Sequence, residues 1–172
     1  MRIETERLII RPLAPDDLDQ LAAILGDPTT MRWWPQPLSR DEAAGWLERN
    51  LARHAEDGFG RCAVELRGRP GLIGDCGIVR TTIMDQPAND LGYIIHHPFQ
   101  RRGYAAEAAR ALRDHAFAAL GLPILHANMA ADHLGSRRVA ELLGGELVAT
   151  FANPRNRMIE TCLYEIKPGR AD

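Results

Sequence analysis

The sequence predicts an α/β fold in which helices cover a mixed β-sheet, and it predicts a single domain. The chain has 172 residues, which is enough for one substantial core and short for two. Segments with strand and helix periodicity follow one another in the order β-α-α-β-β-β-α-β-α-β-β. No repeat, low-complexity tract or linker interrupts this order. We therefore expect residues 1–172 to form one domain.

The first segments predict a strand, a helix and a loop. Residues 8–11 form an apolar run that ends at Pro12, because proline has no N–H to donate to a central sheet. Two aspartates then precede leucines and alanines at helical spacing, which predicts a helix over residues 16–25 that ends at Gly26. Prolines flank two adjacent tryptophans in the next segment, so we expect residues 29–37 to form a loop.

A capped helix and a hairpin are predicted next. Residues 39–42 read SRDE, which has the S-x-x-E form of a capping box and predicts a helix to about His54. The period then changes from helical to alternating. Residues 61–66 and 72–82 read as two strands, because the RGRPG between them has the glycines and proline of a turn.

The middle of the chain predicts a strand, a helix and a strand. Residues 90–96 read as a strand that ends before Pro98. An alanine-rich helix follows, with its apolar face over residues 105–116 and its end at Gly121. Residues 124–129 then read as the next strand.

The last segments predict a short helix and a hairpin. Residues 136–143 have helical spacing and end at two glycines. Residues 146–151 and 158–166 alternate around an Asn-Pro-Arg-Asn turn. We therefore expect the last two strands to lie side by side.

The charge and the apolar segments exclude some classes of partner. The formal net charge of −2 argues against a general nucleic-acid binder, which needs a basic excess to displace counterions from phosphates. The N-terminal MRIETERLII lacks the apolar core of a signal peptide, and no segment approaches the roughly 18 apolar residues of a membrane span. We therefore expect a cytoplasmic protein with no nucleic-acid or membrane partner.

The cysteines and histidines give no indication of a metal. Cys62, Cys76 and Cys162 are odd in number and lack CxxC spacing, so neither a disulfide framework nor a zinc knuckle is predicted. Each is expected to be a small buried apolar residue. His96 and His97 are adjacent, and adjacent strand residues point to opposite faces, so they do not predict a shared metal site.

The sequence QRRGYAAEAA at residues 100–109 places two arginines and a glycine at the start of a helix. The free N–H groups and the positive dipole end of a helix N-terminus suit a phosphate. Gly103 would let a ligand approach the backbone, and Arg101 and Arg102 would offer charged hydrogen bonds. The alternative is a polar surface loop. Neither G-x-x-x-x-G-K-[ST] nor G-x-G-x-x-G occurs, so a phosphate-bearing ligand is allowed but an NTPase is not.

Three segments together resemble one family. The hexapeptide from Gln100 to Ala105 resembles the Q/R-x-x-G-x-G/A motif of the GCN5-related N-acetyltransferases, and it follows a strand that ends in His-Pro. TERLIIRPL at residues 5–13, LGYIIHHPFQRRGYAAEA at 91–108 and SRRVAELLG at 136–144 are similar to the branch with the ribosomal-protein N-terminal acetyltransferases. The resemblance covers nearly the whole chain. It implies a mostly antiparallel sheet that splays open between two parallel strands.

The resemblance implies acetyl-CoA as the co-substrate. Backbone N–H groups of the hexapeptide would bind its pyrophosphate, the preceding strand would pair with the pantetheine arm, and a neighbouring N–H would polarise the thioester carbonyl. His133 stands where the family often has an asparagine that contacts the cofactor, and it could donate to the pantetheine. The implied cofactor-binding residues are Ile94, Ile95, His96, Gln100, Arg101, Arg102, Gly103, Tyr104, Ala105 and His133.

Direct transfer of the acetyl group requires a neutral amine. A lysine amine with a pKa of about 10.4 is neutral less than about once in a thousand at pH 7, whereas an α-amine near 8 is neutral roughly one time in ten. An N-terminal amine therefore needs only a weak base or a water chain. Asp90 and Asp75, which the strand assignment places near the cleft, are the candidate carboxylates. The alternative for each is a solvated charge at a strand end.

The leaving thiolate needs a proton, and the resemblance implies that it comes from the helix near Ser136. Many members of the superfamily use a tyrosine, but the matching position here is Ala140. In the ribosomal-protein branch a serine takes this part, and Ser136 has its place. The alternative for Ser136 is a helix N-cap. His133 could instead titrate near pH 6.5 and serve as the acid itself.

Trp33 and Trp34 lie where the family has its substrate-facing loop. Adjacent aromatic residues in a proline-flanked loop cannot both point into one core along a regular element, so we expect one to pack inward and one to line the acceptor site. The alternative is a plain hydrophobic plug. Together with Asp75, these are the predicted substrate residues.

The predicted function is an acetyl-CoA-dependent N-acetyltransferase, a monomer or homodimer, that acts on the N-terminal amine of a protein or peptide. One alternative acceptor is an aminoglycoside or polyamine, which would call for acidic side chains in the tryptophan loop and at Asp41 and Glu42. A CoA-binding sensor that has lost catalysis is the alternative from another class. One scaffold hosts many acceptors, so the fold does not decide between them.

Overall fold

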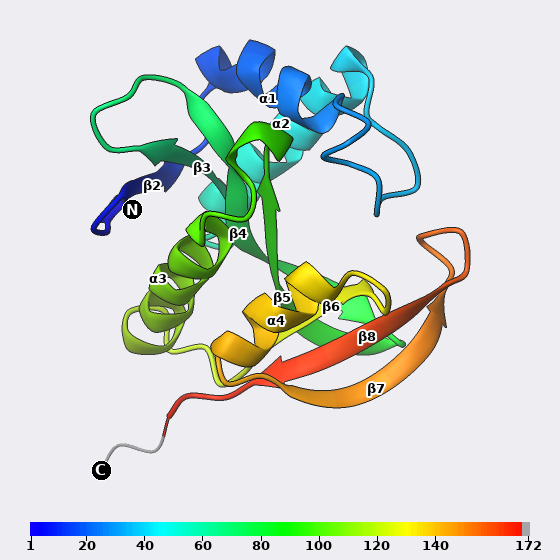
Figure 1. The fold of residues 1–172 in the computed structure, drawn as a ribbon. Helices are drawn as coiled ribbons and strands as arrows, with labels where there is room; N and C mark the ends of the chain where they lie inside the picture. The colour runs from blue at the N-terminus through cyan, green and yellow to red at the C-terminus, as the bar shows by residue number, and fades with distance from the viewer. Residues whose placement is uncertain (170–172) are drawn as a thin grey trace.

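A computed structural model describes residues 1–169 of the chain. Its centre is one eight-stranded sheet with the strand order β1-β2-β3-β4-β5-β6-β8-β7 (Figure 1). Neighbouring strands pair antiparallel except β5 and β6, which are parallel. The strands are β1 (Ile3–Glu4), β2 (Leu8–Pro12), β3 (Arg61–Leu66), β4 (Leu72–Ile83), β5 (Gln86–Ile95), β6 (Leu125–Ala130), β7 (Glu146–Asn153) and β8 (Ile159–Ile166).

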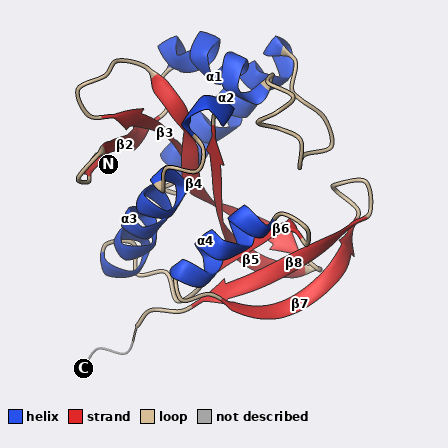
Figure 2. Cartoon of the chain, in the orientation of Figure 1, coloured by secondary structure: helices blue, strands red, loops and turns tan. Residues whose placement is uncertain are grey.

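Four α-helices within residues 1–169 cover the sheet from both faces (Figure 2). They are α1 (Leu18–Leu25), α2 (Arg40–Glu56), α3 (Tyr104–Ala118) and α4 (Leu134–Leu142), with short 3-10 turns at Pro15–Asp17 and His97–Phe99. α1 and α2 form one apolar cluster with residues of β3, β4 and β5. α3 and α4 form a second cluster with residues of most strands. Each helix pair therefore has its own core on its own face of the sheet.

α3 approaches the sheet closely through small side chains. Ala108, Ala109 and Ala116 are fully buried, and Leu112 is 2% exposed. These residues recur at helical spacing, as the alanine-rich face of the sequence predicts. The N-terminus of α3, which begins at Tyr104, is thereby held beside β4 and β5.

β5 and β6 separate after a single parallel contact. β4 and β5 pair continuously from Gly74 opposite Ile95 to Ile83 opposite Gln86. Within residues 1–169, by contrast, β5 meets β6 in one residue pair, Asp90 and His126. Beyond Asp90 the free edge of β5 borders an opening in the sheet. The expected splayed parallel pair in a mostly antiparallel sheet is confirmed.

The hairpin between β4 and β5 differs from the sequence prediction. β5 begins at Gln86, four residues before the predicted start at residue 90. Met84 and Asp85 form the turn with φ of 50° and 60°, a left-handed conformation that two-residue hairpin turns require. Because neither is Gly or Asn, the sequence carries no turn signal there. The two-residue strand β1 was also not predicted.

All three cysteines are free and buried, as the sequence predicts. Cys62 and Cys76 lie opposite each other on β3 and β4. Burial raises the pKa of the Cys62 thiol to about 12, so it stays protonated and packs as an apolar side chain.

Candidate active site

A cleft of about 1340 Å³ opens where β5 and β6 separate. Its floor includes β5 from Asp90 to Ile95, and one wall includes residues 99–101, residues 103–106 and the start of α4. Three loops border the opposite side, which we call the acceptor mouth. They are residues 30–35, the tip of the β4–β5 hairpin at residues 81–85, and the tip of the β7–β8 hairpin at residues 153–156.

The loop before α3 forms a backbone anion site. Arg101 has a φ of 61° and Gly103 a φ of 82°, so two of three consecutive residues are left-handed. This alternation turns successive N–H groups toward one side, as in an anion-binding nest. Within residues 1–169, the N–H groups of Arg101, Arg102 and Gly103 donate to no backbone carbonyl. The side chain of Gln100 donates to the carbonyl of Ile95 at 2.8 Å and holds the loop against β5.

The N-terminal segment braces this loop from outside. Thr5 Oγ1 and Arg7 Nε both donate to the carboxylate of Glu107 in the first turn of α3, at 2.6 Å each. Arg7 Nη1 also donates to the carbonyl of Arg102 at 3.0 Å. These contacts give the TERL sequence at residues 5–8 a structural role, which is to hold the first turn of α3. The resemblance marked the segment, but no local pattern connects it to a helix a hundred residues later.

Most of the predicted cofactor residues line the cleft, and two do not. The side chains or backbone of Ile94, Ile95, Gln100, Arg101, Gly103, Tyr104, Ala105 and His133 border it. His96 does not, and its N–H already donates to the carbonyl of Ile73 at 2.8 Å. Arg102 also lies outside the lining with an exposed side chain, so its guanidinium is not placed at the anion site.

Asp90 lies at the point where the sheet divides. Its carboxylate borders the cleft and accepts a hydrogen bond from Asn128 Nδ2 on β6 at 2.9 Å. Burial raises the pKa of Asp90 to about 6, although Asn128 and the charge of Arg61 oppose the rise. The carboxylate is therefore largely ionised at pH 7 yet basic enough to take up a proton. Asn128 is a site residue that the sequence analysis missed; an amide in an apolar strand was the available signal.

Asp75 is not an acceptor-side residue, and the prediction that placed it at the cleft was wrong. Its side chain is fully buried and absent from the cleft lining. Both carboxylate oxygens pair with the guanidinium of Arg61, and Trp46 Nε1 donates to Oδ2 at 3.0 Å. Because burial and this pairing occupy the whole carboxylate, Asp75 is also not a solvated strand end.

The first turn of α4 does not have Ser136 as its N-cap. α4 begins two residues before the predicted start, and its N-cap is His133, whose Nδ1 accepts from Ser136 N at 3.4 Å. Ser136 is therefore inside the helix, and its alternative as N-cap was wrong. Its half-buried side chain borders the cleft.

His133 is held as a neutral ring. Burial and the charge of Arg32 lower its pKa to about 4, and Nδ1 must be unprotonated to accept the bond from Ser136. This overturns the hypothesis that His133 serves as an acid near pH 6.5. Tyr93, which the sequence analysis did not single out, also borders the cleft and donates its hydroxyl to the carbonyl of Ser136 at 2.7 Å.

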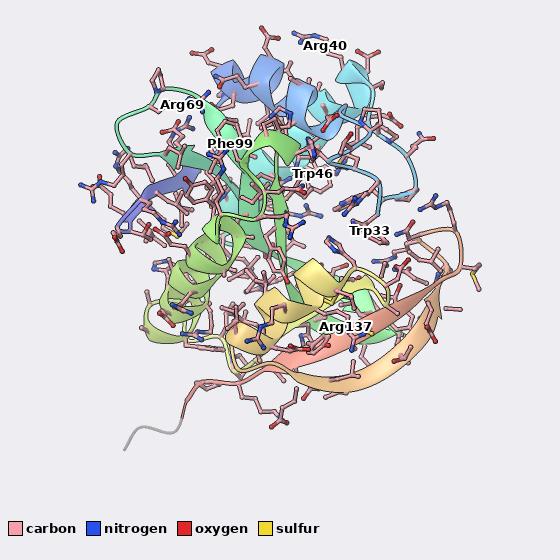
Figure 3. All side chains as sticks on the ribbon, viewed as in Figure 1. Trp33, Arg40, Trp46, Arg69, Phe99 and Arg137 are labelled. Atoms are coloured by element: carbon pink, nitrogen blue, oxygen red, sulfur yellow. The ribbon has the colours of Figure 1, made fainter. Side chains whose placement is uncertain are left out.

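The two tryptophans take different positions, and both border the cleft. Trp33 stacks on the ring of His133 with centroids 4.7 Å apart, and its carbonyl accepts from Asn156 Nδ2 at 2.7 Å. Trp34 packs edge-on against Trp46 at 5.5 Å in the cluster of α1 and α2. Figure 3 shows Trp33 between the α1–α2 loop and the β7–β8 side, with Trp46 nearer α2. The stack thus joins the tryptophan loop to the start of α4, and the bond from Asn156 joins the same loop to the β7–β8 hairpin.

No group of three or more metal-binding side chains occurs within residues 1–169. In the same part of the chain, no helix combines the length and the apolar character that crossing a membrane requires.

Comparisons with known proteins agree with this geometry. The family described as "Acetyltransferase (GNAT) domain" matches residues 7–146. The uncharacterized N-acetyltransferase YnaD of Bacillus subtilis (strain 168) is 27% identical over 145 residues, covering 84% of this chain and 82% of YnaD. An acetyltransferase structure from Agrobacterium tumefaciens str. C58 is 30% identical, with a TM-score of 0.82 and coverage of 98% of this chain and 95% of that one.

A further structure shares the fold with a bound cofactor. It is RimL, described as a ribosomal L7/L12 alpha-N-protein acetyltransferase in complex with coenzyme A. RimL has 16% identity and a TM-score of 0.81, and the match covers 97% of this chain and 98% of RimL.

Proposed function

The chain belongs to the GNAT acetyltransferase family and is an acetyl-CoA-dependent acetyltransferase, and from this premise we propose that its acceptor is the N-terminal amine of a protein or peptide. One observation carries the proposal: the carboxylate of Asp90 and the hydroxyl of Ser136 border one cleft, between an anion-binding loop and a separate acceptor mouth. A weak base suffices for an α-amine, because about one in ten is already neutral at pH 7. The fold shared with RimL also supports a protein acceptor.

The residues at the α3 end fit the phosphates of acetyl-CoA. The left-handed Arg101 and Gly103 direct N–H groups outward at the positive end of a 15-residue helix. A Cβ at Gly103 would lie 3.3 Å from Arg7 Nη2 and would fill the approach to the backbone. The N–H groups of residues 101–105 are therefore proposed to hold the pyrophosphate, with Gln100 fixing the loop.

When bound, acetyl-CoA supplies a thioester whose carbonyl carbon is attacked by the acceptor amine as the carbon–sulfur bond breaks. The carboxylate of Asp90 is proposed to accept the proton that the amine loses, directly or through one water. Asn128 fixes the orientation of that carboxylate through its hydrogen bond to Oδ1. The raised pKa of Asp90 brings its basicity closer to that of an α-amine.

Ser136 is proposed to return a proton to the leaving sulfur. Its hydroxyl does not cap a helix. Tyr93 holds the same turn of α4 through the carbonyl of Ser136. Ala140, where other members have a tyrosine, is fully buried and faces the core.

The acidic residues that a polyamine or aminoglycoside acceptor was expected to use do not line the cleft. Such an acceptor carries several ammonium groups and needs carboxylates around it. Asp41 and Glu42 are exposed and lie outside the cleft lining, and Glu42 already accepts from the backbone of Ser39. The tryptophan loop contributes a cation, Arg32, instead.

The acceptor is tested by locating the acetyl group after reaction. Three acceptors are compared: a peptide with a free N-terminus and one lysine, the same peptide with a blocked N-terminus, and spermidine. We expect thiol release only with the first, and fragment mass spectrometry should place the acetyl group on the α-amine. Acetylation of the lysine side chain, or turnover with spermidine alone, would contradict the proposed acceptor.

A further inference from the structure

The acceptor mouth carries two arginines on opposite walls. Arg32 lies on the α1–α2 loop and Arg155 at the tip of the β7–β8 hairpin, and both exposed side chains border the cleft. Arg32 stacks over the ring of Trp33 at 5.1 Å, and Arg155 Nη1 donates to Thr81 Oγ1 at 3.1 Å. Within residues 1–169, neither guanidinium forms a salt bridge with a carboxylate.

The other charges near the mouth do not neutralise these two arginines. The guanidinium of Arg61 is already paired with Asp75 beneath the cleft. Asp85, at the tip of the β4–β5 hairpin, and Asp132, beside α4, border the cleft with exposed side chains. Neither forms an ion pair with Arg32 or Arg155, so both cations remain available to a ligand.

The charges of Arg32 and Arg155 lower the pKa values of His133 and Asp90. The pKa of His133 is lowered by burial and then by Arg32. The pKa of Asp90 is raised by burial, and Arg155 is among the charges that lower it again. The charges of Arg32 and Arg155 therefore act on groups that border the cleft.

We propose that Arg155 and Arg32 bind a carboxylate that the acceptor carries close to its reacting amine. The proposal rests on the proposed function, because it names the acceptor class of the same site. Guanidinium groups bind carboxylates through paired, charge-assisted hydrogen bonds. The carboxylate is an Asp or Glu side chain just after the N-terminal residue of a peptide, or the α-carboxylate of a free amino acid. A second ammonium group at the same position is repelled.

The experiment compares acceptors that differ in one side chain. Peptides that begin Ser-Asp, Ser-Asn and Ser-Lys and are otherwise identical are assayed for kcat/KM at low ionic strength, beside free serine and serine amide. We expect the Ser-Asp peptide to exceed the Ser-Asn peptide by about tenfold or more, and the Ser-Lys peptide to be the poorest. The preference should shrink as salt is added, because both arginines are exposed.

Charge reversal identifies the residue responsible. Arg155→Ala should bring the Asp-to-Asn ratio toward one, Arg32→Ala should lower it, and Arg155→Glu should favour the Ser-Lys peptide over the Ser-Asp peptide. Arg110→Ala, an exposed arginine on α3 outside the cleft, is the matched control and should keep the wild-type ratio. Calorimetry with the acetylated peptides in the presence of CoA reads the same preference as a difference in Kd, without turnover.

The outcomes separate the two proposals. Equal kcat/KM and equal Kd for the Asp and Asn peptides, or a preference that survives both Arg155→Glu and Arg32→Ala, would overturn the carboxylate site alone. Preference for free serine over serine amide, with no turnover of peptides, would support the carboxylate site and overturn the peptide acceptor. Turnover limited to polyamines such as spermidine would overturn both.

Discussion

Asp90 occupies the one position where β5 and β6 pair, and this position gives its carboxylate an environment suited to proton transfer. Burial raises its pKa to about 6, and Asn128 keeps one oxygen oriented. Ser136 borders the same cleft, and its hydroxyl does not cap a helix. In the proposed mechanism Asp90 is the base and Ser136 is the acid.

Replacing Asp90 tests the base. Asp90→Asn should lower kcat by about 10²–10⁴ and remove an acid limb near pH 6 from the pH–rate profile, because the amide cannot accept the proton. Steady-state rates from pH 5 to 9 with saturating acetyl-CoA measure this. Asp132→Asn, an exposed carboxylate bordering the same cleft, is the control and should keep the limb. An unchanged limb in Asp90→Asn would remove Asp90 from the mechanism.

Asp90→Asn should also change how the free energy of unfolding depends on pH. The folded-state pKa of Asp90 lies above its ordinary value, so the folded state binds the proton more tightly than the unfolded state. Stability from this group is therefore present at low pH and is lost as the pH rises from about 4 to about 6. Asp90→Asn should be more stable than the wild type at pH 7 and should lose this dependence, as measured by urea unfolding across that range.

Replacing Ser136 tests the acid. Ser136→Ala should lower kcat by about 10²–10⁴ with little loss of stability, because the hydroxyl caps no helix. Ser39→Ala is the opposite case: Ser39 caps α2 in a capping box, so stability should fall by about 1 kcal/mol while kcat is retained. Turnover and thermal unfolding of the two variants measure both effects. A kcat within about twofold of wild type in Ser136→Ala would show that the proton comes from elsewhere.

At the scale of elements, the loop before α3 is held by the N-terminal segment of the chain. Its backbone is left-handed at Arg101 and Gly103. Thr5 and Arg7 on the segment before β2 hold Glu107, and so fix α3 beneath the loop. Burial acts to raise the pKa of Glu107, but these hydrogen bonds hold it below its ordinary value. The brace therefore keeps its charge at neutral pH.

The anion site is tested through Gly103. Gly103→Glu places a carboxylate where the phosphates are proposed to lie, and it should abolish the thermal stabilisation caused by acetyl-CoA. Gly121→Glu is matched in charge and in conformation, with a φ of 62° and open space around its Cβ position, and should retain the stabilisation. Differential scanning fluorimetry with and without acetyl-CoA measures both. Equal stabilisation of the two variants would mean that the phosphates bind elsewhere.

At the scale of the whole molecule, a buried ion pair lies beneath the divided sheet. Arg61 on β3 and Asp75 on β4 are both nearly inaccessible to water, and Trp46 of α2 completes the hydrogen bonding of the carboxylate. Burial opposes the charge of Arg61, but its pairing with Asp75 raises the pKa of the guanidinium. The pair ties the sheet to α2 at the level where the cleft begins.

Removing the charge of Asp75 should destabilise the protein. Asp75→Asn leaves the guanidinium of Arg61 buried without a counter-charge and should lower the free energy of unfolding by about 3–5 kcal/mol. Asp19→Asn, which breaks an exposed pair with Arg40, should leave it nearly unchanged. Urea unfolding of the three proteins makes the comparison. A much smaller decrease in the free energy of unfolding of Asp75→Asn would show that water or a movement of Arg61 solvates the unpaired guanidinium.

Local chemistry accounts for the part of the structure that the sequence predicts. The strand at residues 61–66 and the capping box at Ser39 were placed correctly, because alternation and capping act within a few residues. Where the local signal was absent, as at the Met84–Asp85 turn, the prediction failed.

Contacts between distant segments decided the rest. Residue types and spacing could not distinguish Asp75 from Asp90, yet one is locked in an ion pair and the other borders the cleft. The stacking of Trp33 on His133 joins residues a hundred positions apart, and burial and the charge of Arg32 lower the pKa of that ring. Burial and charge pairing depend on which segments meet in space, so the pKa values and the charge of the acceptor mouth arise only when the sheet has formed and divided.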